Sequence, residues 1–419
     1  MIDTAIKLGL SGIAITDHEC LSAHMEANIY AQEILKEHPD FKVALGNEIY
    51  LVDKRERGIK YYHFILIAKD AIGHKALREM SSTAWINSYV DRRLERVPLT
   101  KDEMASILSK YKGHVIATTA CIGGELSSWA LLYATAKQKQ DMESAQIYYN
   151  NICNFIDFCL EIFGEDFYIE CAPSNQKDQC TVNKELYNIS QYYHIPMVVG
   201  LDAHYLVKED RFIHKAYLNS KGGEREVDSF YEFTYLMDSD ECKNLLLNSL
   251  PEDFIETIFN NTVELQNKIQ NYSLERKQII PKVEVKNYPI NQPLSSKYPV
   301  INSLLASSNI QERYWINECL LGLKNKNIYN DTYLARIETE ADVIKYIGDK
   351  LDDCLFAYFN TFKHYIDLFW ECGSIVGPGR GSSTGFLSNY ALGLTQLDPI
   401  RWDIKYWRFL NKERAELPD

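Results

Sequence analysis

The sequence contains no apolar run that approaches the roughly 18 to 20 residues of a membrane-spanning helix, which argues against an integral membrane protein. The N-terminus, MIDTAIKLGLSGIAITDHE, lacks a basic segment followed by an apolar block, so no secretory signal is expected. The ten cysteines include no CxxC pair and no regular framework, a pattern typical of reduced thiols. These absences together predict a cytoplasmic protein.

Positive charge is scarce as well. Lys and Arg total 45 against 58 for Asp and Glu, and the net charge of −13 disfavours a globally basic nucleic-acid binder. An enzyme that holds DNA in one local groove remains compatible, because net charge does not describe the lining of a cleft. The 46% hydrophobic content fits a globular protein, and 419 residues predict two or three domains at roughly 150 residues each.

The first half of the chain alternates strand and helix signals. Short apolar strands are predicted at residues 13–16, 42–50, 63–68, 115–118, 167–171 and 197–200, with helical stretches between them. This alternation predicts βα units in a parallel sheet or barrel. Polar residues follow several of these strands, as at Asp17, Cys121 and Asp202. Ligands bind at the carboxyl ends of strands in such folds, so the placement favours a functional site there.

Six side chains in or after these strands are of the types that hold zinc, manganese or iron. They are His18, Glu48, His63, Cys121, Asp202 and His204. Asp202 and His204 are two residues apart, and on an extended segment both would reach one ion. A cluster of two or three ions could activate water to hydrolyse a phosphate ester. Singly, a strand histidine or a buried cysteine has an ordinary structural explanation, and only their joint occurrence favours a metal site.

These residues carry a family resemblance. The motifs are ITDHE (15–19), GNEIYL (46–51), HFILIAKD (63–70), TTACIGGEL (118–126) and VVGLDAHYL (198–206). In order and spacing they resemble the PHP domain at the start of bacterial C-family replicative polymerases, the DNA polymerase III alpha subunits. The resemblance implies a distorted (βα)7 barrel and a trinuclear Zn²⁺ or Mn²⁺ centre with the six residues above as ligands. Asp17 would support these ligands, and Glu170 lies near a further family ligand position.

One family feature is missing. The family pattern begins with an H-x-H pair on the first strand, and this chain contains no H-x-H anywhere. We therefore expect a barrel without its first strand, which implies either a start upstream or a lost site. The resemblance accordingly predicts weakened or absent phosphoesterase activity.

A second candidate site is the Gly-rich segment Gly377–Ser383. It follows an apolar strand predicted at Ser374–Val376 and precedes a helix predicted at Thr384–Leu392. Glycines expose backbone N–H groups, a helix N-terminus favours an anion, and Arg380 adds a fork of donors for phosphate. The segment is not a Walker A motif, since it lacks G-K-[ST]. A nucleoside triphosphate tail fits this chemistry, although a structural turn explains a Gly-rich loop equally well.

Residues 354–419 resemble the entry to the palm of the same polymerase family. The resemblance implies that the incoming deoxynucleotide's triphosphate binds Gly379, Arg380, Gly381, Ser382 and Ser383. Asp419 matches the first carboxylate of a P-D-x-D pair that holds two catalytic Mg²⁺ ions. Lys412 and Arg414 lie where the family has basic residues near the active site. Because the chain stops at Asp419, we expect a fragment from a split or interrupted gene or a truncated reading frame.

The sequence therefore predicts an α/β fold. Residues 1–215 would form an incomplete PHP-type barrel, 216–300 a helical and extended connection, and 301–419 the first part of an α+β palm. The expected function is part of a DNA-directed DNA polymerase, inactive alone, with primer-template DNA, dNTP, sliding clamp and other replisome subunits as partners. The alternatives are a free PHP-type phosphoesterase or 3′–5′ exonuclease, and a structural fragment that acts only with a second polypeptide.

Overall fold

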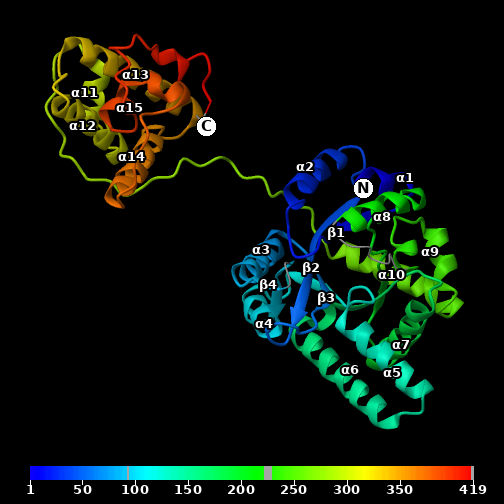
Figure 1. The fold of residues 1–419 in the computed structure, drawn as a ribbon. Helices are drawn as coiled ribbons and strands as arrows, with labels where there is room; N and C mark the ends of the chain where they lie inside the picture. Colours follow the sequence, from blue (N-terminus) through cyan, green and yellow to red (C-terminus); the bar gives the residue numbers. More distant parts are fainter. Residues whose placement is uncertain (92–93, 221–228, 417–419) are drawn as a thin grey trace. The chain divides into compact units, whose positions relative to one another are not determined.

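The computed structural model describes residues 1–91, 94–220 and 229–416. Its contacts divide the chain into two compact units, Met1–Glu275 and Arg276–Asp419 (Figure 1). Each unit has a hydrophobic core of its own. Within the described ranges, no helix has both the length and the apolar character that a membrane crossing requires.

The first unit is built on a curled mixed sheet. Its strands are β1 (Gly12–Ile15), β2 (Lys42–Val52), β3 (Tyr62–Ala68), β6 (Pro98–Thr100), β7 (Val115–Thr118), β8 (Phe167–Cys171) and β9 (Met197–Val199). Their order is β1-β2-β3-β7-β8-β9, and β6 pairs with β2. All pairings are parallel except those of β3, which runs antiparallel to both neighbours. A wholly parallel sheet was therefore the wrong expectation, because the 53–61 loop is too short for a crossover helix.

Helices surround this sheet and give an α/β fold, as the sequence predicts. They are α1 (Ile2–Lys7), α2 (His24–Ile34), α3 (Ala71–Ile86), α4 (Lys101–Leu108), α5 (Glu125–Gln138), α6 (Met142–Phe163), α7 (Lys177–Tyr193), α8 (Arg211–Ser220), α9 (Ser239–Leu246) and α10 (Glu252–Asn267). The sequence signals missed three strands: β6, and the two strands β4 (Tyr89–Asp91) and β5 (Leu94–Arg96), which pair with each other.

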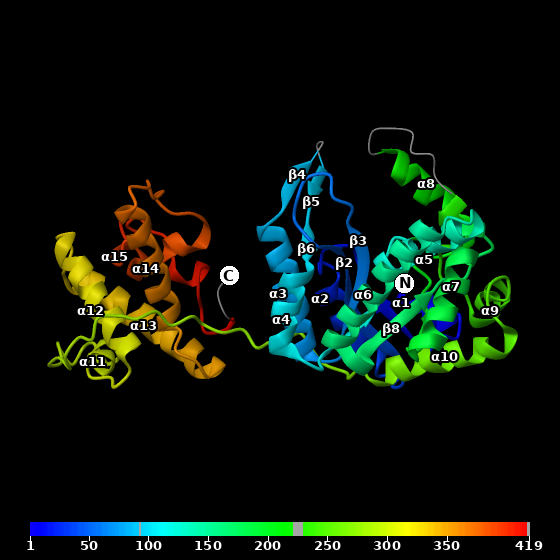
Figure 2. The same ribbon diagram turned by 90° about the horizontal axis from the view of Figure 1, so that it is seen from below.

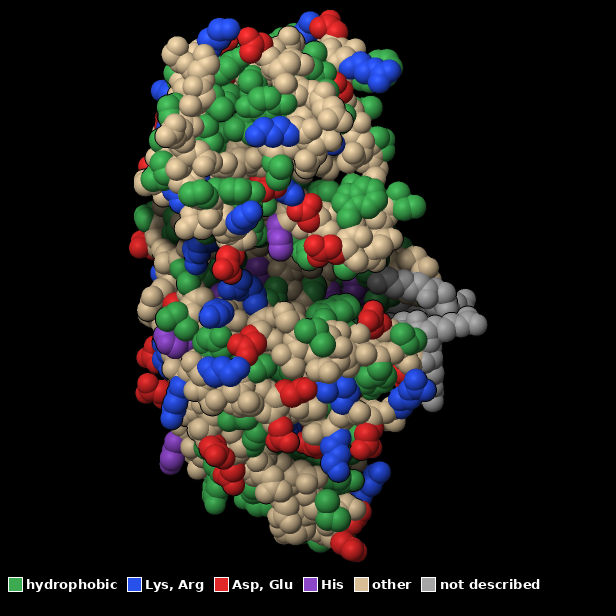
Figure 3. Space-filling model, turned by 90° about the vertical axis from the view of Figure 1, so that its left-hand side faces the viewer, with side chains coloured by type: hydrophobic (Ala, Val, Ile, Leu, Met, Phe, Trp, Pro, Cys, Tyr) green, Lys and Arg blue, Asp and Glu red, His purple; other side chains and the backbone are tan. Residues whose placement is uncertain are grey.

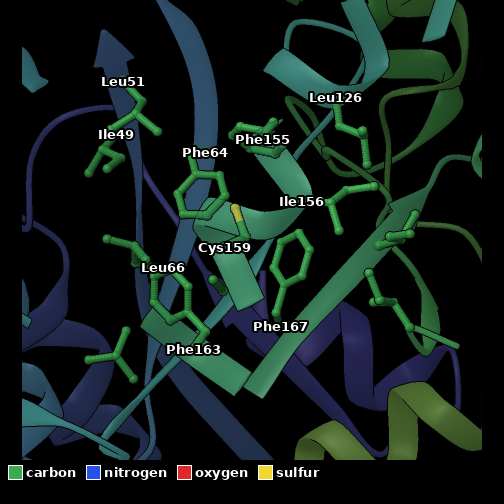
Figure 4. Close-up of a cluster of buried hydrophobic side chains, with 14 of the residues drawn as sticks. Ile49, Leu51, Phe64, Leu66, Leu126, Phe155, Ile156, Cys159, Phe163 and Phe167 are labelled. Carbon is green, nitrogen blue, oxygen red and sulfur yellow. The ribbon is translucent and has the colours of Figure 1, made fainter. Parts of the chain in front are cut away.

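The core of the first unit lies between the sheet and α6. Phe155 from α6 meets the ring of Phe64 edge to face with centroids 6.0 Å apart, and Phe167 of β8 packs into the same cluster (Figure 4). Full burial of one such aromatic side chain contributes about 1.5–3 kcal/mol. This packing fixes β2, β3 and β8, the strands that carry Glu48, His63 and Glu170.

The second unit is helical in its described residues. Its helices are α11 (Pro299–Leu305), α12 (Ile310–Asn325), α13 (Asp331–Leu351), α14 (Phe356–Glu371) and α15 (Leu387–Ala391). Trp315, Phe359 and Phe386 are fully buried at its centre. The strand predicted at Ser374–Val376 is wrong: the segment is irregular, and Ile375 is 94% exposed with no neighbouring strand to cover it within 276–416.

Candidate metal centre

Backbone pairing brings the first three candidate ligands together. β2 carries Glu48, and the residues after β1 run beside it, so that His18 and Glu48 form an isolated bridge. His63 is the second residue of β3 and bridges to Gly124, and its backbone N–H donates to the carbonyl of Gly123 at 3.1 Å. The Cys121–Gly124 turn is thereby held against the sheet, and three segments distant in sequence converge on one point.

The carboxylate of Glu48 lies between two imidazoles. His63 Nδ1 is 2.6 Å from Oε1 of Glu48, and His18 Nδ1 is 3.8 Å from Oε2. The ligand atoms of these three residues all lie within 4.8 Å of one another, close enough to share one metal ion. Cys121 joins them, with Sγ 3.4 Å from His63 Nδ1.

Asp202 and His204 lie beside this group, in the loop after β9. The His204 ring centroid is 6.3 Å from that of His18, and His204 Nδ1 is 3.6 Å from Oδ1 of Asp202. Their proximity does not come from an extended segment, as the two-residue spacing suggested. Asp202 has a φ of +47°, so a turn brings the two side chains together. The structure thus gathers all six predicted residues, and their roles as ligands stay predictions.

The electrostatics of the cluster favour a bound cation. Burial raises the pKa of Glu170 to about 7, against the hydrogen bond that the Thr118 hydroxyl donates to it. Burial raises the pKa of Asp202 too, and the charge of Glu48 adds to this effect. Crowded acids without a countercharge are costly, and a divalent ion would offset that cost. The nitrogen, oxygen and sulfur donors present fit Zn²⁺ or Mn²⁺.

Burial also opposes charge on two other candidate ligands. It lowers the pKa of His18 and raises the pKa of the Cys121 thiol. Neutral imidazole is the form that binds a metal, whereas the thiol must lose its proton to do so. Metal affinity at this site should therefore rise with pH.

Left-handed backbone conformations cluster around the site. Glu19, Ala120 and Asp202 have φ values of +58°, +59° and +47°, and each lies at or next to a candidate ligand. A non-glycine residue held this way costs on the order of 1–3 kcal/mol, and such residues concentrate at functional sites. No sequence signal marked these positions, because all three are ordinary L-residues.

Sequence reasoning missed two parts of the site. Tyr50 stacks on His63 with centroids 5.2 Å apart, and strand alternation from Glu48 could have revealed it. A cavity of about 600 Å³ opens beside Cys121 and Asp202, bounded by the start of α7.

Asp17, which was predicted to support the ligands, contacts Glu48 through its backbone. The carbonyl of Asp17 accepts a hydrogen bond from the backbone N–H of Glu48.

The Gly-rich loop of the second unit is largely exposed. Arg380, Gly381 and Ser382 face solvent, and the Ser383 hydroxyl donates to the carbonyl of Arg380 at 2.8 Å. The triphosphate-binding roles of Gly379, Arg380, Gly381, Ser382 and Ser383 stay predictions, and Asp419 lies outside the described residues. Lys412 pairs with Asp342, and Arg414 pairs with Glu416.

The helix expected to cradle an anion behind this loop differs from the prediction. In place of a helix over 384–392, a 3₁₀ turn (η5, Gly381–Gly385) precedes the five-residue α15. The carboxylate of Glu340 accepts from the N–H groups of Leu387 and Ser388 at 2.7 and 2.8 Å. These N–H groups are therefore satisfied internally, and any phosphate must bind through the loop itself.

Comparison with known proteins finds two family matches along the chain. Residues 1–174 match the PHP domain family, and residues 303–419 match the family described as bacterial DNA polymerase III alpha NTPase domain. A DNA-directed DNA polymerase of Bacillus phage SPbeta is 38% identical over 100% of this chain and 34% of its own length. A probable DNA polymerase of Bacillus subtilis (strain 168) gives the same values. The DNA polymerase III subunit alpha of Thermus aquaticus is 26% identical over 97% of this chain and 35% of its own length.

The first unit thus contains a PHP domain, a metal-binding fold. Along its whole length the chain is similar to proteins named DNA polymerase from a phage and from Bacillus subtilis, and to bacterial proteins named DNA polymerase III subunit alpha. It spans about a third of the length of these curated relatives.

Proposed function

We propose that this chain supplies the PHP metal centre and part of the nucleotide-binding region of a DNA-directed DNA polymerase. The reaction of the assembled enzyme would be transfer of a nucleotidyl group from a dNTP to a primer 3′-hydroxyl. The whole-chain homology to proteins named DNA polymerases carries this proposal. Primer-template DNA, a sliding clamp and other replisome subunits would be its partners.

In this proposal the chain does not extend primers alone. It spans about a third of its relatives' length, so a further polypeptide segment would complete the catalytic site. In the Gly-rich loop, Arg380 and the exposed backbone of Gly381 and Ser382 would hold the triphosphate. Mg²⁺ would serve the nucleotidyl transfer, with Asp419 as one of its carboxylate ligands.

The PHP centre would hold Zn²⁺ or Mn²⁺. His18, Glu48 and His63 would share one ion, with Cys121, Asp202 and His204 available for neighbouring positions. When bound, such ions polarise a phosphate ester and lower the pKa of a coordinated water. The chain's own contribution is to fix the ligands on and beside paired strands, with Glu48 buried and His18 open to solvent.

A second candidate function is phosphodiester hydrolysis at this centre. The cavity of about 600 Å³ favours it, because it borders Cys121 and Asp202 and gives a substrate room beside the ligands. The absent H-x-H motif limits the expected rate. We therefore expect this activity to be weak in the purified chain.

Three measurements on the full chain separate these possibilities. Metal analysis after purification should find about one tightly held ion per chain, and a metal-free protein would contradict the proposed centre. Primer extension with dNTP and Mg²⁺ should give no product, and extension by the chain alone would contradict the need for further polymerase segments. Release of nucleotides from a labelled oligonucleotide, abolished by His63→Ala, would establish the hydrolytic function instead.

A further inference from the structure

A stack of aromatic rings leads from the metal centre to the surface of the first unit. Tyr50 stacks on His63 with centroids 5.2 Å apart, and its other neighbour, Tyr61, stacks on it at 4.5 Å. Arg96 of β5 lies over Tyr61, 5.4 Å from the ring centroid, and donates a hydrogen bond to its hydroxyl at 3.1 Å. The outer ring, Tyr61, closes the 53–61 loop that joins β2 to β3.

That loop carries an unusual concentration of positive charge for a chain of net charge −13. Residues 54–60, KRERGIK, contain four basic side chains and one acidic one. Arg55 is bound to Glu103 at 2.5 Å, whereas Lys54, Arg57 and Lys60 are exposed. Lys54 and Arg57 have no ion-pair partner among the described residues. Their charge is therefore free to meet an anion.

The β4–β5 hairpin holds this loop in place from the other side. The Tyr89 hydroxyl donates to the carbonyl of Glu56 at 3.2 Å, and Figure 2 shows the hairpin projecting from the first unit beside the ends of β2 and β3. Trp85, at the end of α3, is 43% exposed and donates to the carbonyl of Glu19, next to His18. The hairpin and the end of α3 thus place further aromatic side chains beside the loop and next to His18.

We propose that the 53–61 loop and the Tyr61–Tyr50 stack form a binding strip for single-stranded nucleic acid. Phosphates would lie along Lys54 and Arg57, and a base would stack on the guanidinium of Arg96, which covers the outer ring. Bases of a single strand expose their faces to aromatic side chains, whereas the bases of a duplex are already stacked on one another. The strip rests on the proposed role in DNA synthesis, and it specifies which form of DNA approaches the PHP centre.

The surface elsewhere explains why affinity should be modest. On the face drawn in Figure 3, acidic and basic side chains are interspersed and form no broad field of one sign. Binding should therefore depend on the local contacts and weaken with salt. Each lost phosphate contact reduces the salt slope of log K by about 0.7 for a single strand.

The test uses fluorescence anisotropy with the full chain treated with EDTA and a fluorescein-labelled oligothymidine of about 20 nucleotides. The double variant Lys54→Glu/Arg57→Glu should weaken binding at least tenfold and reduce the salt slope by about 1.4. Tyr61→Leu, which keeps an apolar side chain, should weaken binding about fivefold or more. The control Lys7→Glu/Lys36→Glu makes the same charge change at exposed positions near the amino ends of β1 and β2, and should stay within twofold.

Several results would overturn the strip. Equal weakening by the control would mean that only overall charge matters, and equal affinity for a duplex would assign the wrong form of DNA. Competition by polyglutamate at the same concentration of charge would indicate an acidic peptide site. Because EDTA removes metal, these outcomes are independent of the metal content and hydrolysis that test the proposed function. Circular dichroism of each variant would confirm that it is folded.

Discussion

Nδ1 of His24 and Nε2 of His74 lie 3.0 Å apart in the interior of the first unit, within hydrogen-bond distance. Nε2 of His24 is 2.8 Å from the carbonyl oxygen of Gly46 and must donate to it, so Nδ1 accepts the proton of His74. The pair joins α2 to α3 and braces β2 two residues before Glu48. His24 has to be neutral for this arrangement to form, because its Nδ1 accepts a proton from His74.

Acid should therefore destabilise the first unit. Burial, with smaller contributions from His24 and Arg78, lowers the pKa of His74 to about 4. Since an unfolded histidine titrates near 6.5, the unfolded chain binds more protons between about pH 6.5 and 4. Stability should be flat above this window and fall by on the order of 2 kcal/mol across it. Urea denaturation at pH 7 and pH 5 measures the loss.

A matched pair of variants assigns this loss to the buried histidines. His74→Gln removes the titrating group and should flatten the pH dependence, although it lowers stability at pH 7. His38→Gln changes an exposed histidine and should leave the dependence intact. An unchanged pH profile in His74→Gln would show that other groups dominate.

Replacement of the shared carboxylate should empty the metal centre. Glu48→Gln removes the negative charge between His18 and His63 while preserving shape, so that the ion loses its principal countercharge. We expect the affinity for Zn²⁺ or Mn²⁺ to fall by more than the roughly 10- to 100-fold typical of residues that only orient ligands. Competition with a chelator measures it, with the exposed Glu26→Gln as the control. Retention of metal by Glu48→Gln would place the ion elsewhere in the cluster.

Part of the metal centre could be predicted from the sequence, because short apolar strand patterns mark the segments that carry its residues. The alternation in β2 and β3 places Glu48 and His63 correctly, and Val115–Thr118 and Phe167–Cys171 have the predicted limits. The bond between His24 and His74, in contrast, spans 50 residues of sequence. Such pairs depend on how helices dock, which no local period specifies. The antiparallel direction of β3 could have been predicted from the sequence, since a loop of nine residues between β2 and β3 is too short for a parallel crossover.

In the second unit, α15 also depends on a contact distant in sequence that local patterns cannot predict. Glu340 is fully buried on α13, and its carboxylate accepts from two N–H groups 47 and 48 residues later in the chain, and from Arg336. Glu340→Ala should cost about 3–5 kcal/mol, because it leaves buried donors and a half-buried arginine without their acceptor. Urea denaturation would show this as a lower midpoint. Glu371→Ala, at an exposed position, is the control and should change stability by less than about 0.5 kcal/mol.

The conformation of the Gly-rich loop depends on one of its glycines far more than on its neighbour. Gly379 has a φ of +118°, and a Cβ there would lie 2.9 Å from Cγ2 of Thr384 and 3.0 Å from Cγ2 of Thr395. Gly379→Ala should therefore lower the stability of the loop by on the order of 1–3 kcal/mol, through backbone strain and this contact. Gly377 has open space around its Cβ position, so Gly377→Ala should be nearly neutral. Thermal unfolding gives the stability, and proteolysis at Arg380 reports whether the loop has opened. Equal behaviour of the two variants would mean that the loop is not held in this conformation, and the proposed triphosphate cradle would then lack a fixed backbone.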